Sequence, residues 1–272
     1  FPGALMPAFR SLFLVAALLS GALHAADLRV AVLVQDVAQV SPQGNLVPSS
    51  TPRADEVAFT DELAREICRR IRSRCAFSYV TFGEILPGVE DGRFDLGCGN
   101  FLRSPEREER VAFSEPIFRS ASRLIGSPAT ARAFAGKIGH EVNTGNLRGA
   151  RVAVMEGTQQ QAFLNAIAAE RDLTVVATAT KAAAFDALRD GGADFALLPV
   201  RAGYALISHQ EAGRFGFVGP AVADHGLGDT VHIILPKQEN ALRRSVNQAI
   251  AEIRADGTGH RIVRRHFPVN LD

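Results

Sequence analysis

The feature that most constrains the fold is an alternation of short apolar runs with amphipathic helical patterns. Residues 28–34, LRVAVLV, are an apolar, β-branched run of strand length. Thr60 is placed to cap a helix on which Leu63, Ile67 and Ile71 recur every four residues. Two further strand patterns, AFSYVTF and FDLGCGN, flank a short helical pattern, GEILPGVEDGR. A βαβ series of this kind predicts a parallel sheet.

A second series begins after the glycine-rich, polar passage at residues 136–149. ARVAVMEG predicts a strand, and Thr158 is the expected N-cap of the helix TQQQAFLNAIAAER. The same alternation then runs through LTVVAT, KAAAFDALRDGG and ADFALLPV. Two βα series separated by an irregular join predict two α/β lobes. Neither contains a glycine-rich nucleotide loop or a Walker lysine motif, so no nucleotide cofactor is expected.

Bulk composition fits this organisation. The 272 residues allow two lobes, and 47% hydrophobic and 22% charged residues are typical of a globular protein. A formal net charge of +1 gives no electrostatic reason to expect nucleic acid as a partner. The histidines show no spacing typical of a metal site, and His232, inside an apolar run, is expected to be a core residue.

The N-terminal segment, residues 6–26, has the pattern of a secretory signal peptide. One arginine precedes a short apolar run, and small residues follow up to the expected cleavage site near Ala25 or Ala26. The alternative is a buried helix. No later run is long and apolar enough to cross a bilayer, so the sequence predicts an exported protein that begins near Asp27.

Two of the three cysteines, Cys68 and Cys75, lie close together in EICRRIRSRCAF. On one unbroken helix they would be about 10 Å apart along the axis, too far for a disulfide. If RRIRSR is a last helical turn after which the chain folds back, the two can meet. Metal binding has no support, because no histidine or cysteine cluster accompanies the pair.

Five segments, in this order, resemble extracellular solute-binding protein family 3. The segments are AFTDELAREICRRI, GRFDLGCGNFLRSPEREERVAFSEPIF, LRGARVAVMEGTQQQAFL, DALRDGGADFALL and QAIAEIRADGTGHRIVRRHF. Familiar members are the periplasmic polar amino-acid receptors of ABC importers, such as histidine- and lysine/arginine/ornithine-binding proteins. The Cys68/Cys75 spacing is similar to a small disulfide loop in the histidine-binding members.

The resemblance implies a two-lobed α/β fold of the Venus-flytrap type, the type II periplasmic binding protein, with mostly parallel sheets flanked by helices. Lobe one would comprise residues 27–119 plus 223–272, and lobe two residues 124–217. Two hinge strands, near residues 120–125 and 217–223, would join the lobes around a ligand cleft.

The resemblance also implies the ligand contacts. Arg107, on a helix capped by Ser104, would hold the ligand's carboxylate, because a guanidinium grips a carboxylate bidentately. Thr158 would face the same carboxylate from lobe two, with Gln159 and Gln160 as weaker candidates. Asn100 is expected in the loop after a strand, as a polar contact.

Phe82 would pack on the ligand's side chain, or serve in the core. In this sequence Pro199 stands where the family usually has an aspartate that pairs with the ligand's ammonium. Asp36, at the position of a usual aromatic residue, is a candidate for the missing charge. Leu102 replaces a usual serine. These departures make standard α-amino acids doubtful ligands and leave carboxylates without an amine, or an altered site, as alternatives.

The resemblance therefore predicts a monomeric, non-enzymatic periplasmic protein without cofactors. It would capture a small carboxylate or amino acid and deliver it to an ABC permease. One alternative is a sensor or accessory protein with the same fold. Another is an enzyme similar to cyclohexadienyl dehydratases, for which the sequence after ADFALL offers no obvious acid.

Overall fold

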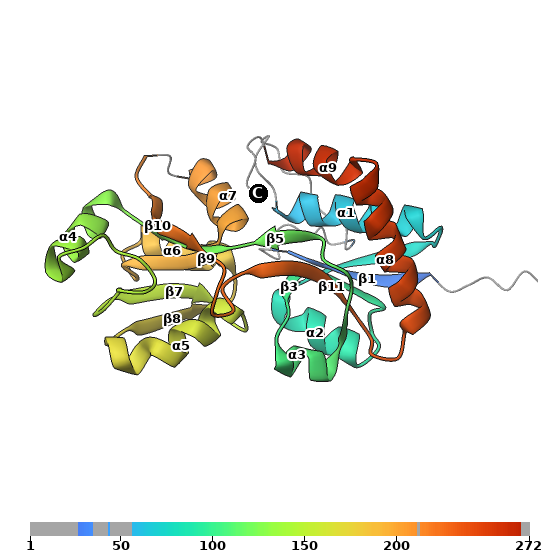
Figure 1. The fold of residues 1–272 in the computed structure, drawn as a ribbon, viewed down its shortest axis with the longest axis horizontal. Coiled ribbons are helices and arrows are strands. Elements are labelled where there is room, and N and C mark those ends of the chain that lie inside the picture. Colours follow the sequence, from blue (N-terminus) through green and yellow to red (C-terminus); the bar gives the residue numbers. More distant parts are fainter. Residues whose placement is uncertain (1–26, 35–42, 44–55, 211–212, 268–272) are drawn as a thin grey trace, which may run out of the picture.

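The computed structural model describes residues 27–34, 43, 56–210 and 213–267, and they form two α/β lobes, each built on one sheet (Figure 1). In lobe one the strand order is β2-β1-β3-β11-β4, with β5 also paired to β11. Its strands are β1 (Leu28–Leu33), β2 (Cys75–Val80), β3 (Leu96–Leu102), β4 (Ala112–Phe113), β5 (Phe118–Ser120) and β11 (Asp229–Leu235). In lobe two the order is β10-β6-β9-β7-β8. Its strands are β6 (Ser122–Gly126), β7 (Arg151–Met155), β8 (Thr174–Thr178), β9 (Phe195–Pro199) and β10 (Gly216–Val222).

Three neighbouring strands in each lobe run parallel, as the βαβ alternation predicts. They are β2, β1 and β3 in lobe one, and β9, β7 and β8 in lobe two. The strands next to the lobe junction pair antiparallel: β11 with β3, β4 and β5, and β6 with β9 and β10. The chain reaches these strands from the other lobe or leaves through them toward it. They are therefore not joined to their neighbours by the helical crossover that parallel pairing requires.

Helices cover both faces of each sheet (Figure 1). Their bounds are α1 (Glu56–Arg70), α2 (Phe82–Glu90), α3 (Pro105–Arg110), α4 (Pro128–Ile138), α5 (Gln159–Arg171), α6 (Lys181–Arg189), α7 (Val200–Gln210), α8 (Asn240–Ala255) and α9 (Thr258–His266). In lobe one, α1, α8 and α9 bury one apolar core against the sheet and α2 another. In lobe two, the two cores lie under α4 and α5 and under α6 and α7.

Helix α1 differs from the sequence-based expectation at its start. Thr60 is not an N-cap: it lies inside α1, and its hydroxyl donates to the Glu56 carbonyl oxygen at 2.8 Å. The helix begins earlier because Val57 and Phe59 are buried and extend its apolar face by one turn. The arginine-rich end is correctly predicted, with Arg69 and Arg70 in the last turn.

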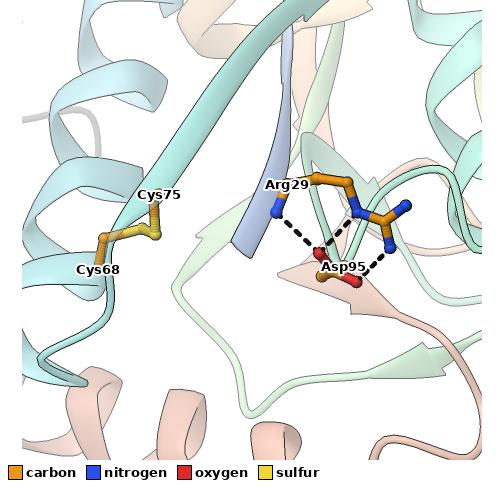
Figure 2. The surroundings of a disulfide bond; sticks show 4 residues. All are labelled: Arg29, Cys68, Cys75 and Asp95. Carbon is orange, nitrogen blue, oxygen red and sulfur yellow. Dashed lines mark hydrogen bonds and ion pairs between the residues drawn. A yellow bond between two sulfur atoms is a disulfide. The ribbon is translucent and has the colours of Figure 1, made fainter. Parts of the chain in front are cut away.

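The predicted disulfide is present. Cys68, near the end of α1, is bonded to Cys75, the first residue of β2, so the chain folds back after the helix (Figure 2). The third cysteine, Cys98, is buried in β3. In the surroundings of the disulfide, the guanidinium of Arg29 on β1 pairs with Asp95, just before β3 (Figure 2).

The chain passes between the lobes twice. It enters lobe two at Ala121, between β5 and β6, and it returns between β10 and β11. Ser122 is fully buried at the first crossing, where its hydroxyl donates to the Leu227 carbonyl oxygen of the second. The two connecting segments are therefore tied together where the lobes meet.

Candidate functional site

A cavity of about 40 Å³ lies between the lobes. A single water molecule needs about 10–15 Å³ by a comparable measure, so the lobes approach each other closely here. Residues from both lobes form its wall: Glu56, Phe59, Phe82, Gly99, Asn100, Leu102, Arg107, Phe118, Ser120, Met155, Thr158, Gln159, Gln160, Lys181, Pro199, Arg201 and Val231. Six of the seven residues predicted as ligand contacts are among them, and the seventh, Asp36, lies outside the described residues.

Arg107 projects from α3 and is buried, with 7% of its surface exposed. Ser104 caps this helix by accepting from the Arg107 backbone N–H. The Arg107 guanidinium donates to two carbonyl oxygens, Leu102 of lobe one at 2.8 Å and Gly157 of lobe two at 3.0 Å. It also lies 5.7 Å from the ring centre of Phe82.

The electrostatics of Arg107 favour an anion. Burial lowers the pKa of the guanidinium to about 10, because removal from water disfavours the charged form. The carbonyl oxygens that accept from the guanidinium carry only partial negative charge. They therefore compensate incompletely for its lost hydration. A carboxylate in the cleft would provide the full negative charge that a buried guanidinium lacks.

The lobe-two wall is the start of α5. Thr158 is its N-cap, as predicted: its hydroxyl accepts from the Gln161 N–H and donates to the Met155 carbonyl oxygen at 2.7 Å. The Gln160 amide lines the cavity and donates to the buried Ser122 hydroxyl at 2.8 Å. Gln159 lies beside Gly226 of the second crossing.

Asn100 lies within β3, not in a loop after the strand. Its backbone is left-handed, with φ of 57°, and β11 shifts register opposite this part of β3. Asparagine tolerates this conformation better than most residues, and the kink places its side chain at the cavity. The Asn100 amide donates to Glu56 at 3.0 Å.

Glu56 and Lys181 form an ion pair across the cleft that the sequence analysis missed. The Lys181 ammonium, on α6 of lobe two, lies 2.8 and 2.9 Å from the two carboxylate oxygens of Glu56, on α1 of lobe one. Both residues are buried. They are 125 residues apart in sequence, and only the approach of the lobes brings them together.

Arg201 is a third cavity residue that the sequence analysis missed. It follows β9 by two positions, close to Pro199, and is buried. Its guanidinium lies 4.3 Å from the ring centre of Phe118, 5.5 Å from that of Phe267 and 5.6 Å from that of Phe59. Aromatic faces attract a cation, so three phenylalanines hold this positive charge at the edge of the cleft.

Phe82, the predicted apolar contact, lies both at the cavity and against the core. It lines the cavity and packs in the core below α2, stacked on Phe101 at 4.8 Å between ring centres. In the part of the chain that the structure describes, no cluster of three or more His, Cys, Asp or Glu side chains could hold a metal ion. No helix among those residues is long and apolar enough to cross a membrane.

Comparison with known proteins shows the family. The model for bacterial extracellular solute-binding proteins, family 3, matches residues 53–269, most of the chain. The chain belongs to this family. Members similar to it are periplasmic binding proteins of amino-acid transport.

Two such relatives are 28% identical to the chain. One is the histidine-binding periplasmic protein of Salmonella typhimurium, over 225 residues, and the other is the lysine/arginine/ornithine-binding periplasmic protein of Escherichia coli K12, over 228 residues. Each alignment covers 82% of this chain and 84% of the relative. Among solved structures, an ancestral arginine-binding protein bound to arginine superposes with a TM-score of 0.71 at 20% identity, covering 89% of this chain and 99% of that one. The fold is therefore that of the type II periplasmic binding proteins.

Proposed function

We propose that this solute-binding protein captures a small carboxylate-bearing solute between its lobes and delivers it to an ABC permease. The observation that carries the ligand chemistry is Arg107. Its buried guanidinium faces the cavity, and its hydrogen bonds there are to carbonyl oxygens. The related histidine- and lysine/arginine/ornithine-binding proteins support a role in amino-acid-like solute uptake.

The protein acts in the periplasm as a monomer and has no enzymatic role, in keeping with relatives that are binding proteins. Residues 6–26, which lie outside the described residues, act as the signal peptide. Lobe one comprises residues 27–119 plus 223–272 and lobe two residues 124–217, a division supported by the membership of the two sheets.

A second candidate function is that of a sensor or accessory protein with the same fold. Pro199 favours it, because this residue brings no charge to the cleft where the family usually has an aspartate. Such a protein would present its lobes to another envelope protein and would need no transported ligand.

The experiment is a ligand screen by thermal shift on the chain from Asp27, with amino acids and their deaminated counterparts. We expect a carboxylate to raise the unfolding temperature. Arg107→Ala should weaken its binding by about 100-fold or more, because the partner charge is lost from a buried site. Arg107→Lys should give an intermediate loss, since lysine keeps the charge without the bidentate fork.

Arg110→Ala is the matched control. Arg110 lies on the same helix but is more exposed and pairs with Glu90 at 2.6 Å, so its loss should leave ligand binding unchanged. Equal binding by wild type and Arg107→Ala would contradict the proposed site. Absence of any shift across the screen would favour the sensor or accessory function.

A further inference from the structure

The Glu56–Lys181 pair has a direct bearing on ligand choice. Among the described residues that line the cavity, Glu56 is the single carboxylate. Each of its oxygens lies within hydrogen-bond distance of the Lys181 ammonium, and one also accepts from Asn100. The negative charge that an incoming ammonium would seek is therefore already neutralised by the protein.

Local forces alone do not explain this position of Lys181. It is the first residue of α6, where the positive end of the helix disfavours a cation. Thr180 already caps the helix by accepting from the Ala183 N–H at 3.0 Å, so the lysine is not needed to start it. What offsets the cost of burying this ammonium is Glu56, across the cleft.

We propose that Lys181 takes the place of a ligand's amino group, and that the cleft therefore selects small carboxylates that lack an α-amine. The inference rests on the proposed function, because it assumes that Arg107 holds the ligand's carboxylate. An amino acid would bring a second ammonium into the cavity. There Pro199 carries no charge, and the charge of Glu56 is already neutralised by Lys181. Burying that ammonium without a partner is costly. A deaminated carboxylate avoids the cost and leaves the inter-lobe ion pair intact.

The test uses matched pairs that differ only in the amine: glutamate with glutarate, phenylalanine with 3-phenylpropanoate, and arginine with 5-guanidinopentanoate. Affinities are measured by calorimetry on wild type, Lys181→Met, and the double variant Glu56→Gln with Lys181→Met. In wild type we expect the deaminated member of the tightest pair to bind more strongly, by about tenfold or more.

In Lys181→Met, the Glu56 carboxylate loses its lysine partner and its charge can pair with a ligand's ammonium, so the preference should reverse toward the amino acid. The double variant also lacks the lysine but has no charge on residue 56, so it should keep the wild-type preference. If the double variant gains amino-acid binding as Lys181→Met does, the gain comes from space rather than charge, and the proposal is wrong.

Wild type alone also decides the question if Lys181→Met does not fold. Equal or tighter binding of the amino acid, lost in Arg107→Ala, would overturn the role of Lys181 and leave the proposed function standing. No binding by either member of any pair, or binding that survives Arg107→Ala, would remove the proposed function and this inference with it.

Discussion

At the scale of single residues, His232 shows how a buried polar side chain is kept neutral. It lies on β11, 2% exposed, with Nδ1 2.7 Å from the Ser114 carbonyl oxygen and Nε2 2.8 Å from the Thr230 hydroxyl. A carbonyl only accepts, so we assign the proton to Nδ1, and Nε2 accepts from Thr230. The neutral ring thus satisfies both nitrogens, in agreement with its predicted core role.

His232 should make stability depend on pH. Burial lowers the pKa of its imidazole, and nearby Arg103 acts in the same direction. Below about pH 6.5 the unfolded chain takes up a proton that the folded one resists. The contribution is therefore complete above that pH and lost as the pH falls toward the lowered pKa. Denaturant unfolding at pH 7.5 and pH 5 should show lower stability at pH 5.

The control for this effect is His232→Asn, which keeps a hydrogen-bonding side chain but has no group that titrates in this range. The variant should lose less stability than wild type between pH 7.5 and pH 5. Identical pH dependence in the two proteins would contradict the assignment.

Sequence reasoning at this scale found residues whose role is local or is shared with the family. Thr158 was predictable as a cap because N-capping depends on a few neighbouring residues, and Arg107 through its place in a helix-start motif. The pairing of Glu56 with Lys181 could not be predicted, because nothing within one segment indicates a partner 125 residues away. The error at Thr60 has the opposite cause: local cap chemistry was overruled by the buried Phe59.

At the scale of elements, each lobe has an arginine–aspartate ion pair at the same place in its sheet. Arg29 at the start of β1 pairs with Asp95 just before β3, at 2.8 Å. Arg151 at the start of β7 pairs with Asp194 just before β9, at 2.9 Å. In both, the arginine's backbone N–H also donates to the same aspartate. Each pair joins neighbouring parallel strands at equivalent places in the βαβ series.

The disulfide fixes another junction between elements, the turn from α1 into β2. Replacing Cys68 and Cys75 with alanine should lower the free energy of unfolding by about 2.5 kcal/mol, the chain-entropy value for so short a loop. Guanidinium unfolding measures the difference.

Dithiothreitol provides the control for the disulfide. It should destabilise wild type by a similar amount and leave the double variant unaffected. The remaining thiol, Cys98, should stay unreactive because burial raises its pKa to about 12. Equal stability of wild type and the variant would mean that the bond constrains little.

The alternation of strands and helices was predictable from hydrophobic periodicity, since each segment carries its own pattern. The left-handed backbone of Asn100 inside β3 could not be predicted in this way, because the irregularity arises where β11 pairs with β3. Strand β11 lies more than 100 residues later in the chain, outside any local sequence window.

At the scale of the whole molecule, Ser122 links the two crossings between the lobes. Its hydroxyl donates to Leu227 and accepts from the Gln160 amide at 2.8 Å. Ser122→Ala leaves both of these polar groups without their partner, so we expect a loss of about 2 kcal/mol in the free energy of unfolding. Chemical denaturation measures it.

Ser245→Ala is the matched control, because Ser245 is exposed on α8 and its substitution should change stability by less than about 0.5 kcal/mol. If Ser122→Ala were equally neutral, the hydrogen bonds between the crossings would contribute nothing measurable.

The path of the chain also sets an order of events during synthesis. Strand β11 sits between β3 and β4 in lobe one, yet it follows every strand of lobe two in the sequence. The ribosome therefore delivers the whole of lobe two before the sheet of lobe one can be completed. Lobe two is one continuous segment and, apart from Leu227 of the second crossing, can close its core at once. The sheet of lobe one stays incomplete, with the edge of β3 unpaired, until the last third of that lobe's residues has been synthesised.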